Sequence, residues 1–305
     1  MRKLSLITAA VLAGTCILAQ DASKVSSAAD ELGWQMAIHA YTFRKFSIFE
    51  CIDKTAALGL KYMSLSGSVN LGDTNGLGGT NSVTTVNLSD KDAQRIQQVV
   101  AAKGIKLVNI GVVQLPPDEA KSRKVFEFAK KMGIDTLVAE PEPAALDTVE
   151  KLCKEYNIKV AIHDHPKPSR YWNPDTVLEA VKGRTLVMGS CADTGHWLRS
   201  GLDPVECLKK LEGRVITLHF KDLVAEEAKA PAPGKKKKSE SKAMHDVPWG
   251  TGVGNVKAQM AELKRQHFHG AFCVEYEYHW DNSMPEIAEC VKFFNATCAE
   301  LAKSP

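Results

Sequence analysis

The sequence predicts a single α/β domain that folds as a (β/α)8 TIM barrel over residues 34–302. Eight short apolar runs recur along the chain, each of the right length for a strand buried on both faces. Helical patterns separate the runs, and a Gly or Asn able to end a helix precedes most of them. The rival fold, a doubly wound open sheet, needs a glycine-rich turn after its first strand. That turn here is "HAYTFRKF" (39–46), which has no glycine.

The eight expected strands lie within 34–42, 58–66, 103–111, 132–140, 156–164, 182–190, 212–220 and 268–276. Ser89 and Asp203 precede two of the intervening helical patterns and are plausible N-caps. Two segments interrupt the alternation. Residues 66–90 form a long polar stretch after the second strand, and residues 224–246 predict a mobile, low-complexity loop after the seventh.

The first 22 residues have the pattern of a secretory signal peptide. Arg2 and Lys3 precede an apolar run that extends from residue 4 to about residue 19. Residues 23–33 would then be a linker, and we expect an exported, periplasmic protein. Lipoprotein anchoring at Cys16 and an uncleaved buried helix are less favoured alternatives. The apolar run is short for a membrane span, and no later stretch is long enough for one.

Composition argues against a nucleic-acid partner. The net charge of the 305 residues is only +3, and much of the positive charge lies in "GKKKKSESK" (234–242). Seven cysteines remain after Cys16, none of them in a CxxC pair and most within apolar patterns. They therefore indicate small core residues, with neither a disulfide framework nor a zinc cluster implied.

Polar residues gather at the carboxyl ends of the expected strands, where barrels of this type place their functional groups. These residues are His39, Glu140, His163, His165, Asp193, His196, His219 and Glu275. Taken singly, such a glutamate is often only exposed, and such a histidine is often a hydrogen-bonded core residue. Together they would crowd three carboxylates and several imidazoles around one mouth, at a high cost in repulsion and desolvation. A divalent cation would relieve that cost.

The best ligand set in the sequence is Glu140, Asp193, His219 and Glu275, each on a different strand. Three oxygen ligands and one nitrogen form a fairly hard site, which favours one Mn²⁺, Mg²⁺ or Co²⁺ ion over Zn²⁺.

At these residues the chain resembles the xylose isomerase-like TIM-barrel superfamily, over roughly residues 34–302. Within it, the sequence is most similar to the branch of sugar phosphate isomerases/epimerases that includes the ketose 3-epimerases. The resemblance implies that Glu140, Asp193, His219 and Glu275 bind one metal ion. The Asp-x-x-His spacing implies that His196 binds substrate, and "VPWGTGVGN" (247–255) resembles the family's Pro-x-Gly-x-Gly loop.

Two positions depart from that family pattern. Asn255 stands where the family usually has an acidic residue, and the arginine that ketose epimerases carry shortly after the seventh-strand histidine is replaced by the earlier Lys221. Export also fits poorly with a phosphorylated sugar. Exported relatives of this type are associated with the breakdown of 3-keto-glycosides, so a lyase is an alternative function.

The chemistry expected from the resemblance is proton removal next to a carbonyl, through an enediolate, on a non-phosphorylated sugar or keto-sugar. Glu140 or Glu275 would be the base, and Lys221 would polarise an oxygen or donate a proton. His163 and His165 could bind hydroxyls or carry protons. His39, Tyr41 and Trp249 could form a sugar-stacking wall, although packing in the core explains each of them equally well.

Three other functions remain open at this stage. The first is metal-dependent β-elimination on 3-keto-glycosides. The second is a hydrolase of the apurinic endonuclease type, which the weak net charge and the predicted export disfavour. The third is a non-catalytic periplasmic sugar-binding protein, which would need no metal-ready carboxylates. The expected partner is a small sugar, and a homo-oligomer is compatible with the sequence.

Overall fold

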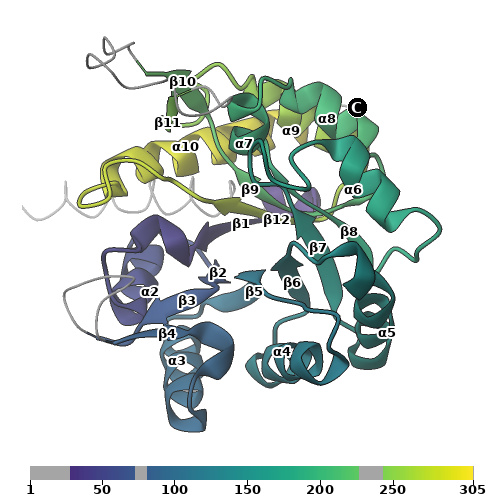
Figure 1. Ribbon diagram of the computed structural model, residues 1–305. Helices are drawn as coiled ribbons and strands as arrows, with labels where there is room; N and C mark the ends of the chain where they lie inside the picture. Colours follow the sequence, from purple (N-terminus) through teal and green to yellow (C-terminus); the bar gives the residue numbers. More distant parts are fainter. Residues whose placement is uncertain (1–27, 73–80, 227–242, 305) are drawn as a thin grey trace, which may run out of the picture.

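A computed structural model describes residues 28–72, 81–226 and 243–304 of the chain (Figure 1). The predicted signal peptide, residues 1–22, lies outside the described residues. Of the predicted linker 23–33, the described part begins with a helical turn at residues 28–31. Ala28 and Ala29 are buried there against the main core, so this part of the segment belongs to the domain.

Eight parallel strands close into a barrel, which confirms the predicted fold class. The order around the barrel is β1-β12-β9-β8-β7-β6-β5-β2, so the first strand pairs with the last and Trp34 lies opposite Gly270. The strands are β1 (Trp34–His39), β2 (Tyr62–Ser66), β5 (Lys106–Val113), β6 (Thr136–Ala139), β7 (Lys159–His163), β8 (Met188–Asp193), β9 (Val215–Phe220) and β12 (Gly270–Val274).

Helices surround this barrel and cover its outer face (Figure 1). They are α2 (Ile48–Ala57), α3 (Asp90–Ala102), α4 (Glu119–Met132), α5 (Leu146–Tyr156), α6 (Pro174–Val181), α7 (Thr194–Arg199), α8 (Pro204–Lys210), α9 (Val256–Arg265) and α10 (Met284–Leu301), with short 3-10 turns η1 (Ala40–Phe43), η2 (Thr85–Asn87) and η3 (Pro143–Ala145). Among the described residues, no helix is both long and apolar enough to cross a membrane.

The predicted N-caps are confirmed. The Ser89 hydroxyl accepts a hydrogen bond from the Asp92 N–H at 3.2 Å, and the Asp203 carboxylate accepts one from the Val205 N–H at 2.8 Å.

The seven cysteines after Cys16 are all buried and free, as the sequence predicted. The main core lies between the barrel and the helices, where Trp34, Phe272 and Phe294 stack edge to face or tilted.

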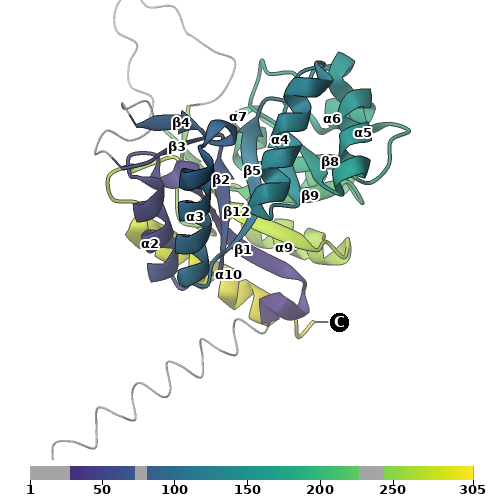
Figure 2. The same ribbon diagram turned by 90° about the horizontal axis from the view of Figure 1, so that it is seen from below.

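Two small antiparallel sheets occupy parts of the sequence that we expected to be loops. β3 (Ser68–Asn70) pairs with β4 (Ser82–Thr84), and Figure 2 shows this pair beside β2 and α3 at one end of the barrel. β10 (Leu223–Ala225) pairs with β11 (Met244–Asp246). The two ends of segment 224–246 are therefore ordered, which corrects the prediction of a loop throughout. Its low-complexity centre lies outside the described residues.

One buried carboxylate fastens the glycine-rich loop that precedes α9 to the end of β9. Asp222 accepts hydrogen bonds of 2.9 Å from the N–H groups of Gly250, Gly252 and Gly254. A Cβ atom added at Gly252 would lie only 2.3 Å from an Asp222 oxygen, so this close approach requires glycine. The "GTGVG" motif thus serves as a backbone cradle for one of the chain's own carboxylates.

Replacing Asp222 by Ala should lower the free energy of unfolding by about 2–4 kcal/mol, because buried N–H groups would lose their acceptor. Urea denaturation of the purified protein measures this change. Asp203→Ala, which removes an exposed N-cap, is the control and should cost about 1 kcal/mol. Equal losses in the two variants would contradict a structural role for the Asp222 cradle.

Candidate active site

Four side chains from adjacent strands meet at the carboxyl end of the barrel. His163 ends β7, Asp193 ends β8, His219 lies on β9 in register with Asp193, and Glu275 directly follows β12. Each offers one nitrogen or oxygen atom, and these four atoms all lie within 4.8 Å of one another. All four residues are buried. The parallel barrel thus brings together residues that are far apart in the sequence.

The chemistry of this cluster fits a divalent cation. Among the described residues, no hydrogen bond reaches His163 Nε2 or His219 Nε2. Buried polar atoms normally have a partner, so two unsatisfied ring nitrogens beside two buried carboxylates indicate a ligand. Two imidazoles and two carboxylates are a recognised ligand set for divalent metals. We call His163, Asp193, His219 and Glu275 the metal cluster.

Glu140 does not join the metal cluster in this structure. Its Oε1 lies 3.0 Å from His163 Nδ1 and also contacts His165 Nδ1, so Glu140 forms a second group with these two histidines. A carboxylate that holds the other ring nitrogen of a ligating histidine is a common arrangement around protein metals. Three of the four ligands predicted from the sequence therefore converge, with His163 in the fourth place, and direct ligation by Glu140 stays a prediction.

Lys221 lies beneath the metal cluster with no exposed surface. Its Nζ is 3.0 Å from Asp193 Oδ2, 2.7 Å from Glu275 Oε2 and 2.9 Å from Glu277 Oε2. Arg199 donates to the same oxygen of Glu277 at 2.9 Å. The cavity above is lined by Glu275 and Glu277 but not by Lys221, so this lysine lies behind the two glutamates. A direct contact of Lys221 with substrate is not supported by this placement.

These buried charges fix one another's ionisation. Burial opposes ionisation of Asp193 and Glu275, but neighbouring basic side chains outweigh it and hold both pKa values below their usual range: His196 and Lys221 beside Asp193, and Lys221 and His219 beside Glu275. Burial alone would lower the pKa of Lys221, yet Asp193 and Glu275 raise it well above the ordinary value. The result is a set of buried anions that stay ionised.

The pKa values of His163 and Glu140 are set in the same way, by burial opposed by neighbouring charges and hydrogen bonds. Burial would lower the pKa of His163, but Asp193 and Glu140 beside the ring raise it to about 10. Burial would raise the pKa of Glu140, but hydrogen bonds with His163 and His165 outweigh burial and lower the pKa to about 2. Glu140 is therefore a carboxylate over the whole neutral range.

His39 and His196 are neutral histidines at the edge of the cluster. Burial and the neighbouring His219 lower the pKa of His39 to about 3, and its Nε2 lies 3.1 Å from the Gly111 carbonyl, which can only accept a hydrogen bond. Burial also lowers the pKa of His196 well below its usual value. Arg199 has only donors, so the His196 Nδ1 at 3.1 Å accepts and its Nε2 carries the proton.

A cavity of about 910 Å³ opens above the metal cluster. One part of its wall is ionisable and is made by His163, His165, His196, Glu275 and Glu277. Another part carries hydroxyl groups, and much of it comes from the β3–β4 pair and the residues before it: Ser66, Ser68, Ser82 and Thr84. The volume is within the usual range of small-molecule sites, roughly 300–1,000 Å³.

Most of the predicted substrate-binding residues line this cavity, but one does not. His39, His163, His165 and His196 are lining residues, and so is Tyr41. Trp249 is instead buried in the main core, with its ring centroid 4.9 Å from that of Phe220. We therefore correct its assignment from sugar stacking to core packing.

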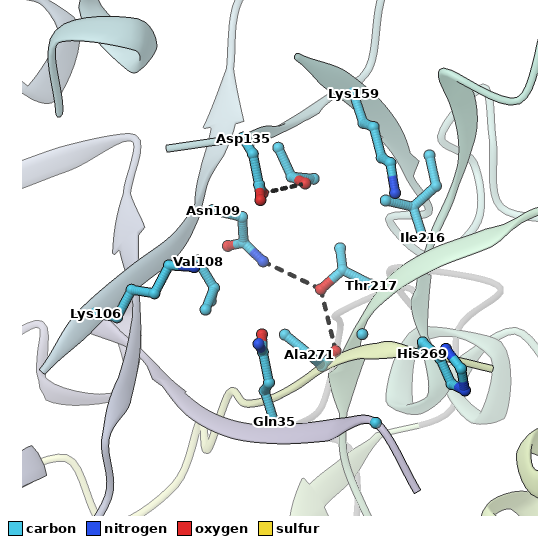
Figure 3. A pocket seen from close by; sticks show the side chains of 13 residues that line it. Gln35, Lys106, Val108, Asn109, Asp135, Lys159, Ile216, Thr217, His269 and Ala271 are labelled. Carbon is cyan, nitrogen blue, oxygen red and sulfur yellow. Dashed lines mark hydrogen bonds between the residues drawn. The ribbon is translucent and has the colours of Figure 1, made fainter. Parts of the chain in front are cut away.

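A second cavity lies at the opposite, amino-terminal end of the barrel and has a volume of about 230 Å³. Figure 3 shows its polar lining, in which Asn109 donates to the Thr217 hydroxyl and Thr217 donates to the Ala271 carbonyl, each at 3.1 Å. None of the site residues predicted from the sequence lines it. In barrels of this class that end serves stability, so the candidate site is the cavity above the metal cluster.

The sequence analysis missed Glu277 and Arg199 as parts of the site. Glu277 follows Glu275 by two residues in "CVEYEY", the spacing that puts two side chains on one side of an extended segment. Arg199 follows His196 by three residues, which places both on one face of α7. Both spacings were visible in the sequence. The pairing of Glu277 with Lys221 required the three-dimensional structure.

Comparison with known proteins identifies the family. The family model described as "Xylose isomerase-like TIM barrel" matches residues 52–297. The chain therefore belongs to the xylose isomerase-like TIM-barrel family. A search of curated proteins gave no match.

Three solved structures illustrate the similarity. A crystal structure of an uncharacterized protein from Parabacteroides distasonis is 34% identical, covers 86% of this chain and 98% of its own, and gives a TM-score of 0.64. A Mycobacterium smegmatis xylose isomerase-like barrel in complex with magnesium is 14% identical, with 88% and 98% covered and a TM-score of 0.66. A D-tagatose 3-epimerase-like protein is 16% identical, with 87% and 98% covered and a TM-score of 0.62. The last two show the fold.

Asp193→Asn and Glu275→Gln should each lower the affinity for a divalent cation by more than about 100-fold, since each removes an anionic oxygen ligand. Equilibrium dialysis of the purified protein against Mn²⁺, Co²⁺ and Zn²⁺ measures this. Glu142→Gln, an exposed neighbour of Glu140 in sequence, is the control and should leave the affinity unchanged. Unaltered metal content in both cluster variants would rule out the metal cluster.

Glu140→Gln should weaken the same affinity by about 10–100-fold, the loss expected when a carboxylate supporting a ligating histidine is removed. The measurement is again equilibrium dialysis, with Asp193→Asn run beside it. A loss as large as that of Asp193→Asn would instead make Glu140 a direct ligand, as the sequence suggested.

Proposed function

We propose that the protein is a divalent-metal-dependent sugar isomerase or epimerase-type enzyme that removes a proton next to a carbonyl group. The observation that carries the proposal is the buried metal cluster at the floor of a cavity large enough for a sugar. A binding protein without catalytic activity would gain nothing from burying so many ionised groups, because each costs desolvation energy. The same arrangement is what metal-assisted enolisation needs.

The cavity lining supports a non-phosphorylated sugar or keto-sugar as substrate. Hydroxyl groups of Ser66, Ser68, Ser82 and Thr84 face the cavity and can both donate and accept hydrogen bonds. Among the described lining residues there is no Lys or Arg to receive a phosphate group. A neutral polyol satisfies such a wall better than a phosphate ester does.

The metal cluster would hold one cation. A bound cation would polarise the substrate carbonyl and stabilise the charge of the enediolate. Two imidazoles in place of one make the ligand set softer than the sequence suggested, so Mn²⁺, Co²⁺ and Zn²⁺ are all suitable, and Mg²⁺ less so. Which of them is native is best determined from metal content after expression without added metal.

Glu275 is the better placed of the two predicted bases. It lines the cavity, whereas Glu140 is not among the lining residues and is engaged with His163 and His165. His165 is half exposed at the rim and can pass a proton between Glu140 and solvent. The neutral His196 lines the cavity with its Nε2 3.5 Å from Asp193 Oδ2, and its Nε2–H can donate to a substrate hydroxyl.

The fate of the abstracted proton decides which reaction occurs. Its return to the opposite face gives an epimer, and its return to the neighbouring carbon gives an isomer. Loss of a substituent on the β carbon gives elimination, and a 3-keto-glycoside lyase is therefore the second candidate. The cavity volume of about 910 Å³ favours that candidate, since it leaves room for an aglycone beside one sugar ring.

The proposed setting is the periplasm, on the strength of the charged and apolar pattern in residues 1–22. A small sugar would be the partner there. Homo-oligomer formation stays a prediction from the sequence.

Solvent exchange in D₂O tests the proposed function directly. The metal-loaded protein, incubated with a panel of free sugars and 3-keto-glycosides, should place deuterium on one carbon next to the carbonyl, and NMR identifies that carbon. Glu275→Gln should reduce the exchange rate by at least about 100-fold, because it removes both the proposed base and an oxygen of the metal cluster. Release of an aglycone would select the lyase. Tight sugar binding without exchange or release would favour the non-catalytic binding protein.

A further inference from the structure

We propose that Lys221 is an internal counter-ion of the metal cluster: its ammonium group and the divalent cation compete for Asp193 and Glu275. Glu277 is the carboxylate that keeps Lys221 paired when the cation binds. This inference rests on the proposed metal-dependent function and adds a control of metal affinity to it.

The geometry shows the competition. Lys221 Nζ lies 3.0 Å from Asp193 Oδ2 and 2.7 Å from Glu275 Oε2, which are oxygens of two residues of the metal cluster. Both the ammonium and a cation would be stabilised chiefly by these same two carboxylates. Two positive charges on one pair of buried oxygens repel each other strongly, because buried charges are screened less than exposed ones. Cation binding therefore weakens the pairing of Lys221, and pairing of Lys221 weakens cation binding.

Glu277 gives Lys221 an alternative partner outside the metal cluster. Its Oε2 is 2.9 Å from Lys221 Nζ, and the residue is absent from the described groups that could hold a metal ion. Arg199 holds the same oxygen at 2.9 Å, and Arg199 is itself held by the buried Asp246 at 3.2 Å. A buried ammonium without any partner would be strongly destabilising. With Glu277 fixed in place, Lys221 can release the ligands without becoming unpaired.

Only the end of the Lys221 side chain is free to make this change. The Lys221 N–H donates to the Thr194 hydroxyl at 2.9 Å, and that hydroxyl donates to the Lys221 carbonyl at 3.1 Å. The aliphatic part lies against Gly195, where an added Cβ would come within 2.7 Å of Lys221 Cδ. Backbone and stem are thus held, so a small shift of Nζ toward Glu277 is the available motion.

The consequence is a reciprocal coupling between the lysine and the cation. Removing the ammonium should strengthen cation binding, and removing its alternative partner should weaken it. If Lys221 had only a structural role, removing its ammonium would not strengthen cation binding, and removing Glu277 would not weaken it.

A cycle of variants measures the coupling by equilibrium dialysis against Mn²⁺, without any activity assay. Lys221→Met should bind Mn²⁺ at least about tenfold more tightly than the wild type. Glu277→Gln should bind it several-fold more weakly, and should have little further effect when Lys221 is already Met. Arg184→Met is the control, since it removes a partly buried cation whose ion pairs are with Asp147 and Glu150, neither of which lines the cavity, and it should change the affinity by less than about threefold.

The metal-free Lys221→Met protein should also melt at a lower temperature than the wild type, and Mn²⁺ should raise its Tm by more. If that variant does not fold, Glu277→Gln carries the test alone: weaker Mn²⁺ binding supports the inference, and equal or tighter binding overturns it. Equal or weaker binding by a folded Lys221→Met overturns it as well, as does a gain of the same size in Arg184→Met.

The outcomes separate this inference from the proposed function. If the wild type binds Mn²⁺ and Lys221→Met binds it no more tightly, only the counter-ion role of Lys221 is contradicted. If neither the wild type nor any variant binds Mn²⁺, that result contradicts the metal-dependent function and, with it, the competition between Lys221 and the cation.

Discussion

The neutralisation of buried negative charge at the carboxyl end of the barrel is the constraint on which the site depends. Asp193 and Glu275 are ionised although both are buried, and Lys221 is paired with both. Ionised groups in such surroundings persist only where a compensating charge is fixed close by. The ammonium of Lys221 supplies that charge within the chain, and a divalent cation would supply it from outside.

The barrel holds the participating side chains on its strands or directly after them. Asp193 and His219 are register partners on β8 and β9, and the Asp193 carboxylate also caps α7 through the His196 N–H at 2.8 Å. The next residue after Lys221, Asp222, fastens the glycine-rich loop. The positions of the charged groups are therefore set by the same hydrogen bonds that close the fold, which keeps the cluster preorganised for a ligand.

The fold and most of the site could be predicted from the sequence, because the repeated apolar runs fix the strands and the strands fix which residues share a rim. Asp193, His219 and Glu275 were placed correctly by that logic alone. The placement of His163 in the metal cluster, with Glu140 beside it in a second group, could not be predicted, since it depends on which way two neighbouring side chains turn. Trp249 was misassigned because an aromatic residue beside a strand end can face the core as well as the cavity. The pairing of β3 with β4 escaped notice because its short strands lie in a polar stretch without apolar alternation.

The central claim is that the metal cluster binds one divalent cation, and anomalous X-ray diffraction from crystals soaked in Mn²⁺ tests it most directly. The account predicts a single strong anomalous peak at the carboxyl end of the barrel, at bonding distance from Asp193, His219 and Glu275. It also predicts that Lys221 Nζ in those crystals lies farther from Asp193 Oδ2 and Glu275 Oε2 than the present 3.0 and 2.7 Å, while it stays paired with Glu277. An empty map at this position, in a protein that still carries its native fold, would contradict the claim.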